Sequence, residues 1–328
     1  LFYVGNGGNL TIRRLNLTGG FVATGALGTT GVGGAIYTKS TLTLVDVVVV
    51  NNTADLGGGL FVVEGTLGAH NTTVGNNKAR YGGGMYISLR SNLKVTHSRI
   101  HDNEVAHHGG GIYCIDDTIC TLEHTIVQNN KADGHAGAIM NERATVNVYN
   151  SQIKDNWAMS NGGALYCEHI PVSCIINDTI LTHNKAENGG GMFCKGKDAT
   201  CVIVGNTVFA ENSLVSSGSS PGLYCENANC TTDGTVHLSL PCLQGTYGTK
   251  VSTIFAPDNW ETQPSSTGTC TPCPGGKYGS VINRTSETGG CPLSCSTGKY
   301  GTVGKSTEED ACHFCKGGQY ANFPGLPV

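Results

Sequence analysis

The stretch Asn103–Cys114, NEVAHHGGGIYC, contains the two signatures that the rest of the chain repeats. Its second half is a run of glycines that ends in an apolar residue and an aromatic. This glycine signature recurs about every 26 residues, at Gly33–Tyr37, Gly57–Phe61, Gly82–Tyr86, Gly109–Tyr113, Gly162–Tyr166 and Gly189–Phe193, with degenerate copies at Gly137–Met140 and Gly222–Tyr224. A period in this range indicates a repeat architecture, in which each unit buries its apolar face by stacking on its neighbours.

The asparagine that opens the stretch belongs to the second signature. It recurs at Asn52, Asn77, Asn103, Asn130, Asn156, Asn184 and Asn212. An apolar residue lies three positions before each asparagine. A turn-forming polar residue or a histidine lies six positions before it, at Asp46, Asn71, His97, His124, Asn150, Asp178 and Asn206. Segments such as Leu42–Leu44 and Val146–Val148 alternate with the period of two that is typical of half-buried strands.

The composition disfavours helical repeats. Glycine and β-branched residues dominate, charged residues make up 13% of the chain, and no segment has the pattern of an amphipathic helix. Each unit is therefore expected to contain two or three short strands joined by tight glycine and asparagine turns. The sequence predicts an all-β fold, a parallel β-helix of about 8–9 coils with like residues about 4.8 Å apart, followed by small disulfide-rich modules.

Two segments carry a resemblance to a known family. Gly33–Ile36 and Phe209–Asn212 resemble the Gly-Gly-Ala-Ile and Phe-x-x-Asn motifs of the polymorphic outer membrane protein repeats. Valine, isoleucine or leucine replaces the phenylalanine in the other repeats. The resemblance covers roughly residues 10–225 and implies a right-handed β-helix. The family's secretion route and outer-membrane anchoring are not carried over.

Fifteen cysteines bear on the compartment. Four pairs each lie within one coil, at Cys114/Cys120, Cys167/Cys174, Cys194/Cys201 and Cys225/Cys230. A disulfide across so short a loop contributes roughly 2–3 kcal/mol by the chain-entropy argument. Metal binding is the alternative, but these pairs lack the C-x-x-C spacing and histidines at fixed offsets. We expect four local disulfides and an oxidising, extracellular setting.

Seven N-x-[ST] acceptors also favour a secreted protein and a eukaryotic source. They lie at Asn9, Asn16, Asn51, Asn71, Asn177, Asn229 and Asn283. Asn71 and Asn177 are expected to occupy the same position in different coils, which would align their glycans along one edge.

The repeat stops after about residue 235, which predicts two domains, residues 1–235 and 236–328. The second segment resembles ephrin-receptor-like cysteine-rich repeats, whose mark is C-x-x-C-P-x-G-x-Y; the match is good over Cys270–Tyr278 and weaker in the other copies. The resemblance implies disulfides that join each cysteine after the signature to the first of the next unit. These are Cys242–Cys270, Cys273–Cys291 and Cys295–Cys312, and they leave Cys315 unpaired, with a partner expected beyond Val328. Zinc ribbons are the alternative, but zinc does not explain the glycine and tyrosine that follow each second cysteine.

Catalysis is not expected. Polysaccharide-active β-helices need clustered carboxylates on one outer face, and the possible acids are Asp116, Asp117 and the pair Asp102/Asp155, two coils and about 10 Å apart. Asn129 lies between the two members of that pair, as in a solvated turn column. We therefore expect no enzyme, no cofactor and no metal.

Two further columns have a structural and a functional interpretation. The pairs His97/His124 and His108/His135 share positions in successive coils and favour a polar ladder over a metal site. The aromatic column at Tyr37, Phe61, Tyr86, Tyr113, Tyr166, Phe193 and Tyr224 favours stacked aromatics over a sugar-binding surface. The net charge of −4, without a basic cluster, argues against nucleic acid, and no apolar run is long enough to span a membrane.

The chain is expected to be structural. Residues 10–20 align with residues 42–52, so the chain begins within a coil, and an uncapped strand edge favours the addition of another chain. We predict a secreted, glycosylated structural protein, a subunit of a filament or surface appendage of a microbial eukaryote, whose partners are copies of itself joined head to tail. A monomeric adhesin for glycans or receptors is the alternative, and a polysaccharide-active enzyme is the second.

Overall fold

The computed structural model describes residues 2–22, 31–169, 173–216 and 220–232, together with the backbone of seven short strands nearer the C-terminus. The chain divides into two compact units. Strands β1–β32 belong to the first unit and strands β33–β39 to the second, and each unit is described by itself. Every regular element in the described ranges is a strand, and no helix in them is long and apolar enough to cross a membrane.

The first unit is a parallel β-helix built from four sheets, named A to D in the order in which each coil visits them. Sheet A has nine strands, β1 (Phe2–Val4), β4 (Ile36–Thr38), β7 (Leu60–Val63), β11 (Met85–Ser88), β15 (Ile112–Ile115), β19 (Ile139–Glu142), β23 (Leu165–Glu168), β27 (Met192–Lys195) and β31 (Leu223–Glu226). Sheet B has nine, β2 (Asn9–Arg13), β5 (Thr41–Val45), β8 (Thr66–His70), β12 (Asn92–Thr96), β16 (Ile119–Glu123), β20 (Thr145–Tyr149), β24 (Ser173–Asn177), β28 (Thr200–Val204) and β32 (Asn229–Thr232).

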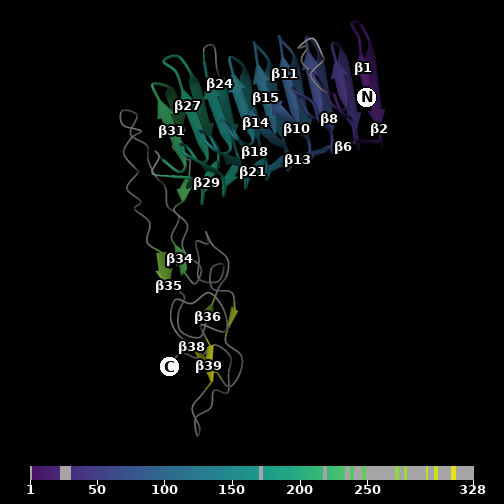
Figure 1. Ribbon diagram of the computed structural model, residues 1–328. Helices are drawn as coiled ribbons and strands as arrows, with labels where there is room; N and C mark the ends of the chain where they lie inside the picture. Colours follow the sequence, from purple (N-terminus) through teal and green to yellow (C-terminus); the bar gives the residue numbers. More distant parts are fainter. Residues whose placement is uncertain are drawn as a thin grey trace. The chain divides into compact units, whose positions relative to one another are not determined.

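The two remaining sheets complete each coil. Sheet C runs through β3 (Asn16–Thr18), β6 (Val48–Val50), β9 (Thr73–Gly75), β13 (Arg99–His101), β17 (Ile126–Gln128), β21 (Gln152–Lys154), β25 (Ile180–Thr182) and β29 (Val208–Ala210). Sheet D has six strands, β10 (Lys78–Tyr81), β14 (Glu104–His108), β18 (Lys131–Ala132), β22 (Trp157–Ala158), β26 (Lys185–Ala186) and β30 (Ser213–Leu214). Figure 1 shows these strands side by side, coil after coil, from β1 to β31.

The pairing is parallel and in register, so that equivalent residues of successive coils form columns along the axis. Tyr86, for example, lies opposite Phe61 on one side and Tyr113 on the other. Alternate residues of each strand face the interior, where Ile36, Leu60 and Met85 begin a fully buried aliphatic column. The predicted all-β parallel β-helix is therefore confirmed.

The two corners beside sheet C are made by residues in the left-handed conformation. The corner between sheets B and C uses Asp46, Asn71, His97, His124, Asn150 and Asp178, with φ between 46° and 56°. The corner between sheets C and D uses Asn51, Asn76, Asp102, Asn129, Asp155, His183 and Glu211, with φ between 52° and 58°. Asparagine and aspartate tolerate this conformation because their short side chains hydrogen-bond locally.

The last B–C corner departs from the predicted pattern. Gly205, with φ of 64°, holds the left-handed position there, and Asn206 is an extra residue. The hydroxyl of Thr207 consequently donates to the carbonyl of Val204, three residues back, whereas the hydroxyl of Ser98 donates to Thr96, two residues back.

The residue after each C–D corner is an asparagine of the predicted signature, and these side chains form a continuous ladder inside the β-helix. Asn103 is fully buried. Its Nδ2 donates to Oδ1 of Asn130 at 2.9 Å and to the carbonyl of Val74 at 3.1 Å, while its own Oδ1 accepts from the backbone and side-chain amides of Asn77 at 3.0 Å. Every polar atom of the side chain is satisfied, which removes the penalty for burying it. The same contacts recur from Asn52 to Asn212.

A second ladder of hydroxyl side chains follows the B–C corner. The backbone amide of Thr72 donates to Oγ of Ser98 at 2.9 Å, and that of Thr125 donates to Oγ of Ser151 at 3.0 Å. Each of these hydroxyls in turn donates to a carbonyl two residues earlier in its own coil. Both buried corners are thus held by side chains that accept from the preceding coil.

The glycine signature makes the corner that leads into sheet A. Its first glycine is left-handed in every full copy, and at Gly82 (φ 61°) a Cβ would lie 2.4 Å from the carbonyl oxygen of Met85. Only glycine avoids this clash without a shift of the backbone. The degenerate copy places Ala136 in the same conformation, with φ of 58°.

The second unit contains three antiparallel strand pairs after β33 (His237–Ser239). They are β34 (Thr246–Gly248) with β35 (Cys270–Pro272), β36 (Lys277–Tyr278) with β37 (Leu293–Ser294), and β38 (Lys299–Gly301) with β39 (Cys312–Phe314). The predicted disulfides Cys242–Cys270, Cys273–Cys291 and Cys295–Cys312, the unpaired Cys315 and the sequon at Asn283 lie wholly or partly outside the described residues. They stay predictions, as does the boundary between residues 235 and 236.

Replacing Asn130 by alanine tests the ladder. The backbone and side-chain amides of Asn103 would lose their acceptor inside the core, so we expect Asn130→Ala to lower the free energy of unfolding by about 2–4 kcal/mol. The control is Asn92→Ala, which truncates an exposed asparagine of β12. Denaturant unfolding followed by circular dichroism measures both, and equal midpoints for the two variants would contradict a stabilising ladder.

Candidate functional site

The aromatic column lies on the outer face of sheet A. Between Tyr3 and Tyr113, consecutive ring centroids are 5.0–5.5 Å apart, and the column resumes from Tyr166 through Phe193 to Tyr224 with spacings of 5.1–5.2 Å. Met140 fills the position between the two runs. The rings cover one another's faces, and Tyr166 and Phe193 are each 1% exposed. A sugar ring has no free aromatic face to stack on in this central part.

A column of histidines borders the aromatic rings. The rings of His108 and His135 stack at 4.8 Å, and His135 stacks on Tyr166 at 4.6 Å. Nδ1 of His108 accepts from the backbone amide of His135 at 2.9 Å, and Nδ1 of His135 accepts from that of Asn161 at 3.3 Å. The column continues as Asn161 and Asn188, whose side chains are hydrogen-bonded at 2.8 Å. This arrangement is a polar ladder that uses one ring nitrogen of each histidine.

The surroundings keep these imidazoles neutral. Burial, followed by the nearby charges of His135 and His107, lowers the pKa of His108 from 6.5 to about 4. Burial also lowers the pKa of His135. A proton on either ring would be poorly solvated, and protons on both would place like charges in contact.

Acidic residues two positions after the aromatic column were not singled out from the sequence. The hydroxyl of Tyr166 donates to Glu168 at 2.6 Å, and the hydroxyl of Tyr113 donates to Glu142. Burial, followed by these hydrogen bonds, raises the pKa of both tyrosines, so the phenols stay protonated. Each acid lies two residues after the column position of its coil, as Lys195 does after Phe193. This constant spacing from the glycine signature could have identified the acids.

The carboxylates considered for catalysis lie at separate corners. Asp102 and Asp155 occupy the C–D corner column with Asn129 between them, and Asp102 accepts a hydrogen bond from His101 at 2.6 Å. Asp116 pairs with Arg143 of the next coil. Asp117 is exposed. The structure therefore leaves Asp102 and Asp155 as members of a turn column and does not gather the four acids into a groove.

The predicted glycosylation sites lie on the outside of the β-helix. Asn9, Asn16, Asn51, Asn71 and Asn229 are exposed, and Asn177 is partly exposed. The expectation that Asn71 and Asn177 share a column is wrong. Asn71 forms a left-handed corner, whereas Asn177 is the last residue of β24, aligned through Tyr149 with the strand residue before that corner. Their alignment is offset by one residue, which turns the two side chains in different directions.

Disulfide bonds join the four cysteine pairs of the β-helix, Cys114–Cys120, Cys167–Cys174, Cys194–Cys201 and Cys225–Cys230. Each links a strand of sheet A to the following strand of sheet B, and all eight cysteines are buried. The last three disulfides stack, because the sulfur atoms of Cys167, Cys174 and Cys201, and those of Cys194, Cys201 and Cys230, lie within 4.8 Å of one another. These are the clusters of metal-ligating atoms in the part of the chain that the structure describes, and their sulfurs are already bonded in pairs.

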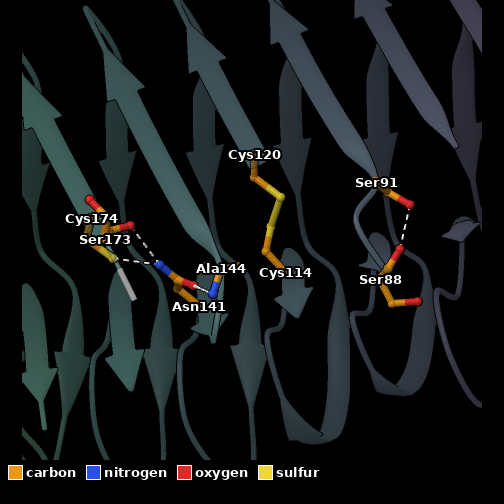
Figure 2. The surroundings of a disulfide bond; sticks show 8 residues. All are labelled: Ser88, Ser91, Cys114, Cys120, Asn141, Ala144, Ser173 and Cys174. Carbon is orange, nitrogen blue, oxygen red and sulfur yellow. Dashed lines mark hydrogen bonds between the residues drawn. A yellow bond between two sulfur atoms is a disulfide. The ribbon is translucent and has the colours of Figure 1, made fainter. Parts of the chain in front are cut away.

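One coil between the disulfides uses hydrogen bonds in their place. Asn141 stands in register between Cys114 and Cys167. Its Oδ1 accepts from the backbone amide of Ala144 at 3.1 Å, and its Nδ2 donates to the carbonyl of Ser173 at 3.0 Å and to Sγ of Cys174 at 3.1 Å. Figure 2 shows this amide beside the Cys114–Cys120 bond.

Comparison with known proteins identifies a family for the first unit. A protein-family model described as a right-handed beta helix region matches residues 2–169, from the first strand of sheet A to the end of β23. No curated protein and no solved structure matches the chain.

A fifth disulfide can be introduced where the series is interrupted. Val146 stands in register between Cys120 and Cys174, as Asn141 does between Cys114 and Cys167. We expect the double variant Asn141→Cys/Val146→Cys to form a disulfide during oxidative folding. Peptide mass spectrometry without reduction would detect it. The control is the double variant Asn141→Cys/Asn147→Cys, because the side chain of residue 147 points to the opposite face of the strand from that of Val146. A disulfide in the control variant and none between residues 141 and 146 would contradict the register.

The buried histidines predict acid sensitivity. Because the pKa of His108 in the folded protein lies below its ordinary value of 6.5, the unfolded chain takes up the proton first as the pH falls, and stability is lost between about pH 6.5 and about pH 4. The variant His108→Asn carries the residue type that follows in the same column, and its melting temperature should fall less over this range. The control is His124→Asn, an exposed corner histidine, which should keep the wild-type slope. Equal slopes for all three proteins would contradict this role of His108.

Proposed function

Because the chain belongs to the family of right-handed β-helix regions, we propose that it is an extracellular structural rod. One observation carries the proposal, the unbroken amide ladder from Asn52 to Asn212. Each coil is bonded to the next by strands and by buried side chains with the same geometry. Bending or opening the stack would leave buried amides without partners, which costs free energy at every coil. Such a stack is suited to hold a fixed length.

The disulfides and the exposed sequons support an extracellular setting. Four covalent links constrain the corner between sheets A and B, and disulfides of this kind persist in oxidising compartments. We propose that glycans on the exposed asparagines, such as Asn9, Asn16 and Asn51, hydrate the outside of the rod. We also propose that the first segment is related to the polymorphic outer membrane protein repeats. The second segment would be related to ephrin-receptor-like repeats and would act as a spacer. The source that we propose is a microbial eukaryote.

Assembly of copies end to end is the finer part of the proposal. Its support is the uniform register of the coils. Because successive coils pair in the same way throughout the chain, a coil of a second copy could pair with this chain as the next coil does. Unpaired strand edges favour addition of a further strand. A head-to-tail contact that does not close would generate a filament.

A catalytic role is not proposed, and an adhesive role is the second choice. The acidic residues that could act on a sugar lie at separate corners, as described above. The central aromatic rings cover one another, with Tyr113 4% exposed, so they offer no stacking surface for a glycan.

Electron microscopy and sedimentation of the native protein test the assembly. We expect filaments whose mass per length corresponds to one chain after another along the axis, and peptide mass spectrometry should find glycans on Asn9, Asn16 and Asn51. A protein that sediments as a monomer at every accessible concentration would rule out end-to-end assembly. Binding of that monomer to a glycan array would then favour the adhesin.

A further inference from the structure

An open hollow lies where sheet B turns into sheet C. It has a volume of about 330 Å³, at the lower end of the range for small-molecule sites. Its walls come from the corner column and from strands β9, β13 and β17. The lining residues are Asn71, Thr72, Thr73, His97, Ser98, Arg99, His124 and Ile126.

The lining carries basic groups and no carboxylate. Arg99 is exposed and makes no ion pair in the part of the chain that the structure describes. The rings of His97 and His124 stack at 4.9 Å, and His70 lies against His97 at 5.4 Å.

Two acids of the adjoining elements have partners of their own. Asp46 accepts a hydrogen bond from the lining residue Asn71 at 2.7 Å and pairs with Arg14 at 3.9 Å. Glu123 pairs with Lys94 on sheet B at 3.2 Å. Neither acid forms an ion pair with Arg99.

The floor of the hollow is rigid. Thr72 and Ser98 belong to the buried hydroxyl ladder, where the amide of Thr72 donates to Oγ of Ser98 at 2.9 Å and both hydroxyls donate to carbonyls of their own coils. Arg99 lies opposite Thr73 and Ile126 in the sheet register. The side chains around the floor thus stand on strands whose positions are set by the core.

We propose that this hollow binds one sulfate or carboxylate group of an acidic saccharide. Arg99 would hold the anionic group, because a guanidinium matches the geometry of such an oxyanion with parallel N–H donors. The rings of His97 and His124 would supply further N–H donors. Ile126 supplies an apolar wall for the sugar carbons. The overall charge of −4 disfavours a polyanion that needs a broad basic surface, such as nucleic acid. The inference does not depend on end-to-end assembly.

Fluorescence anisotropy with a labelled sulfated tetrasaccharide tests the site, on protein freed of N-glycans so that the sequon at Asn71 does not interfere. We expect Arg99→Ala to weaken binding about tenfold.

The control variant is Arg13→Ala, which removes an exposed arginine of β2 on another face. It should bind as the wild type does. Equal losses for Arg13→Ala and Arg99→Ala would show attraction to overall charge and would overturn the proposal, as would an unchanged affinity of Arg99→Ala. Competition by inorganic sulfate as effective as by the unlabelled tetrasaccharide would identify a simple anion site and would overturn the assignment to a saccharide.

Discussion

The buried amide ladder is the constraint on which the rest of the structure depends. A primary amide in an apolar core is costly unless both its donors and its acceptor are used. Here each asparagine satisfies its neighbours in the adjacent coils, as Asn103 does with Asn77 and Asn130. A shift of one residue in any coil would remove the amide from the column and leave partners unsatisfied on both sides. The ladder therefore selects the register of all four sheets, and the aliphatic columns follow from it.

Much of this arrangement could be predicted from the repeat itself. The residue six positions before each signature asparagine is the left-handed residue of the B–C corner in all but one coil, because side-chain chemistry at a tight corner is restrictive. At the C–D corner the left-handed residue is the one before the asparagine, such as Asp102 before Asn103. The exception, Gly205 in place of Asn206, arises from an inserted residue, which a count along the chain does not reveal. The error for Asn71 and Asn177 has another cause, since the six-residue spacing itself pairs Asn71 with Asp178, one residue after Asn177. The sequence did not identify Glu142 and Glu168, the hydrogen-bond partners of Tyr113 and Tyr166. Residues on an outer face are not buried in the core, so they follow no periodic hydrophobic pattern.

Disulfides and hydrogen bonds are interchangeable at one position of the coil. In the coil of β19 and β20, Asn141 closes the corner between sheets A and B with hydrogen bonds to Ala144 and to the next coil. Cys114 and Cys167 close it covalently in the coils on either side. The covalent bond restrains the unfolded chain as well as the folded one, whereas the amide acts only in the folded state. Three of the four covalent links lie in the later coils, where they stack.

The amide ladder also has a direction. Every Nδ2 between Asn52 and Asn184 donates toward the coil that follows it in the chain, so the side-chain dipoles point the same way and do not cancel. The side of each coil that faces the next coil offers an amide hydrogen to the asparagine there. The side that faces the preceding coil offers the amide oxygen together with the second amide hydrogen, which bonds a backbone carbonyl such as that of Val74. The two sides of a coil are therefore chemically different. The stack of coils is thus polar. A filament built by extending it would have two chemically different ends, and subunits would add and dissociate differently at each end.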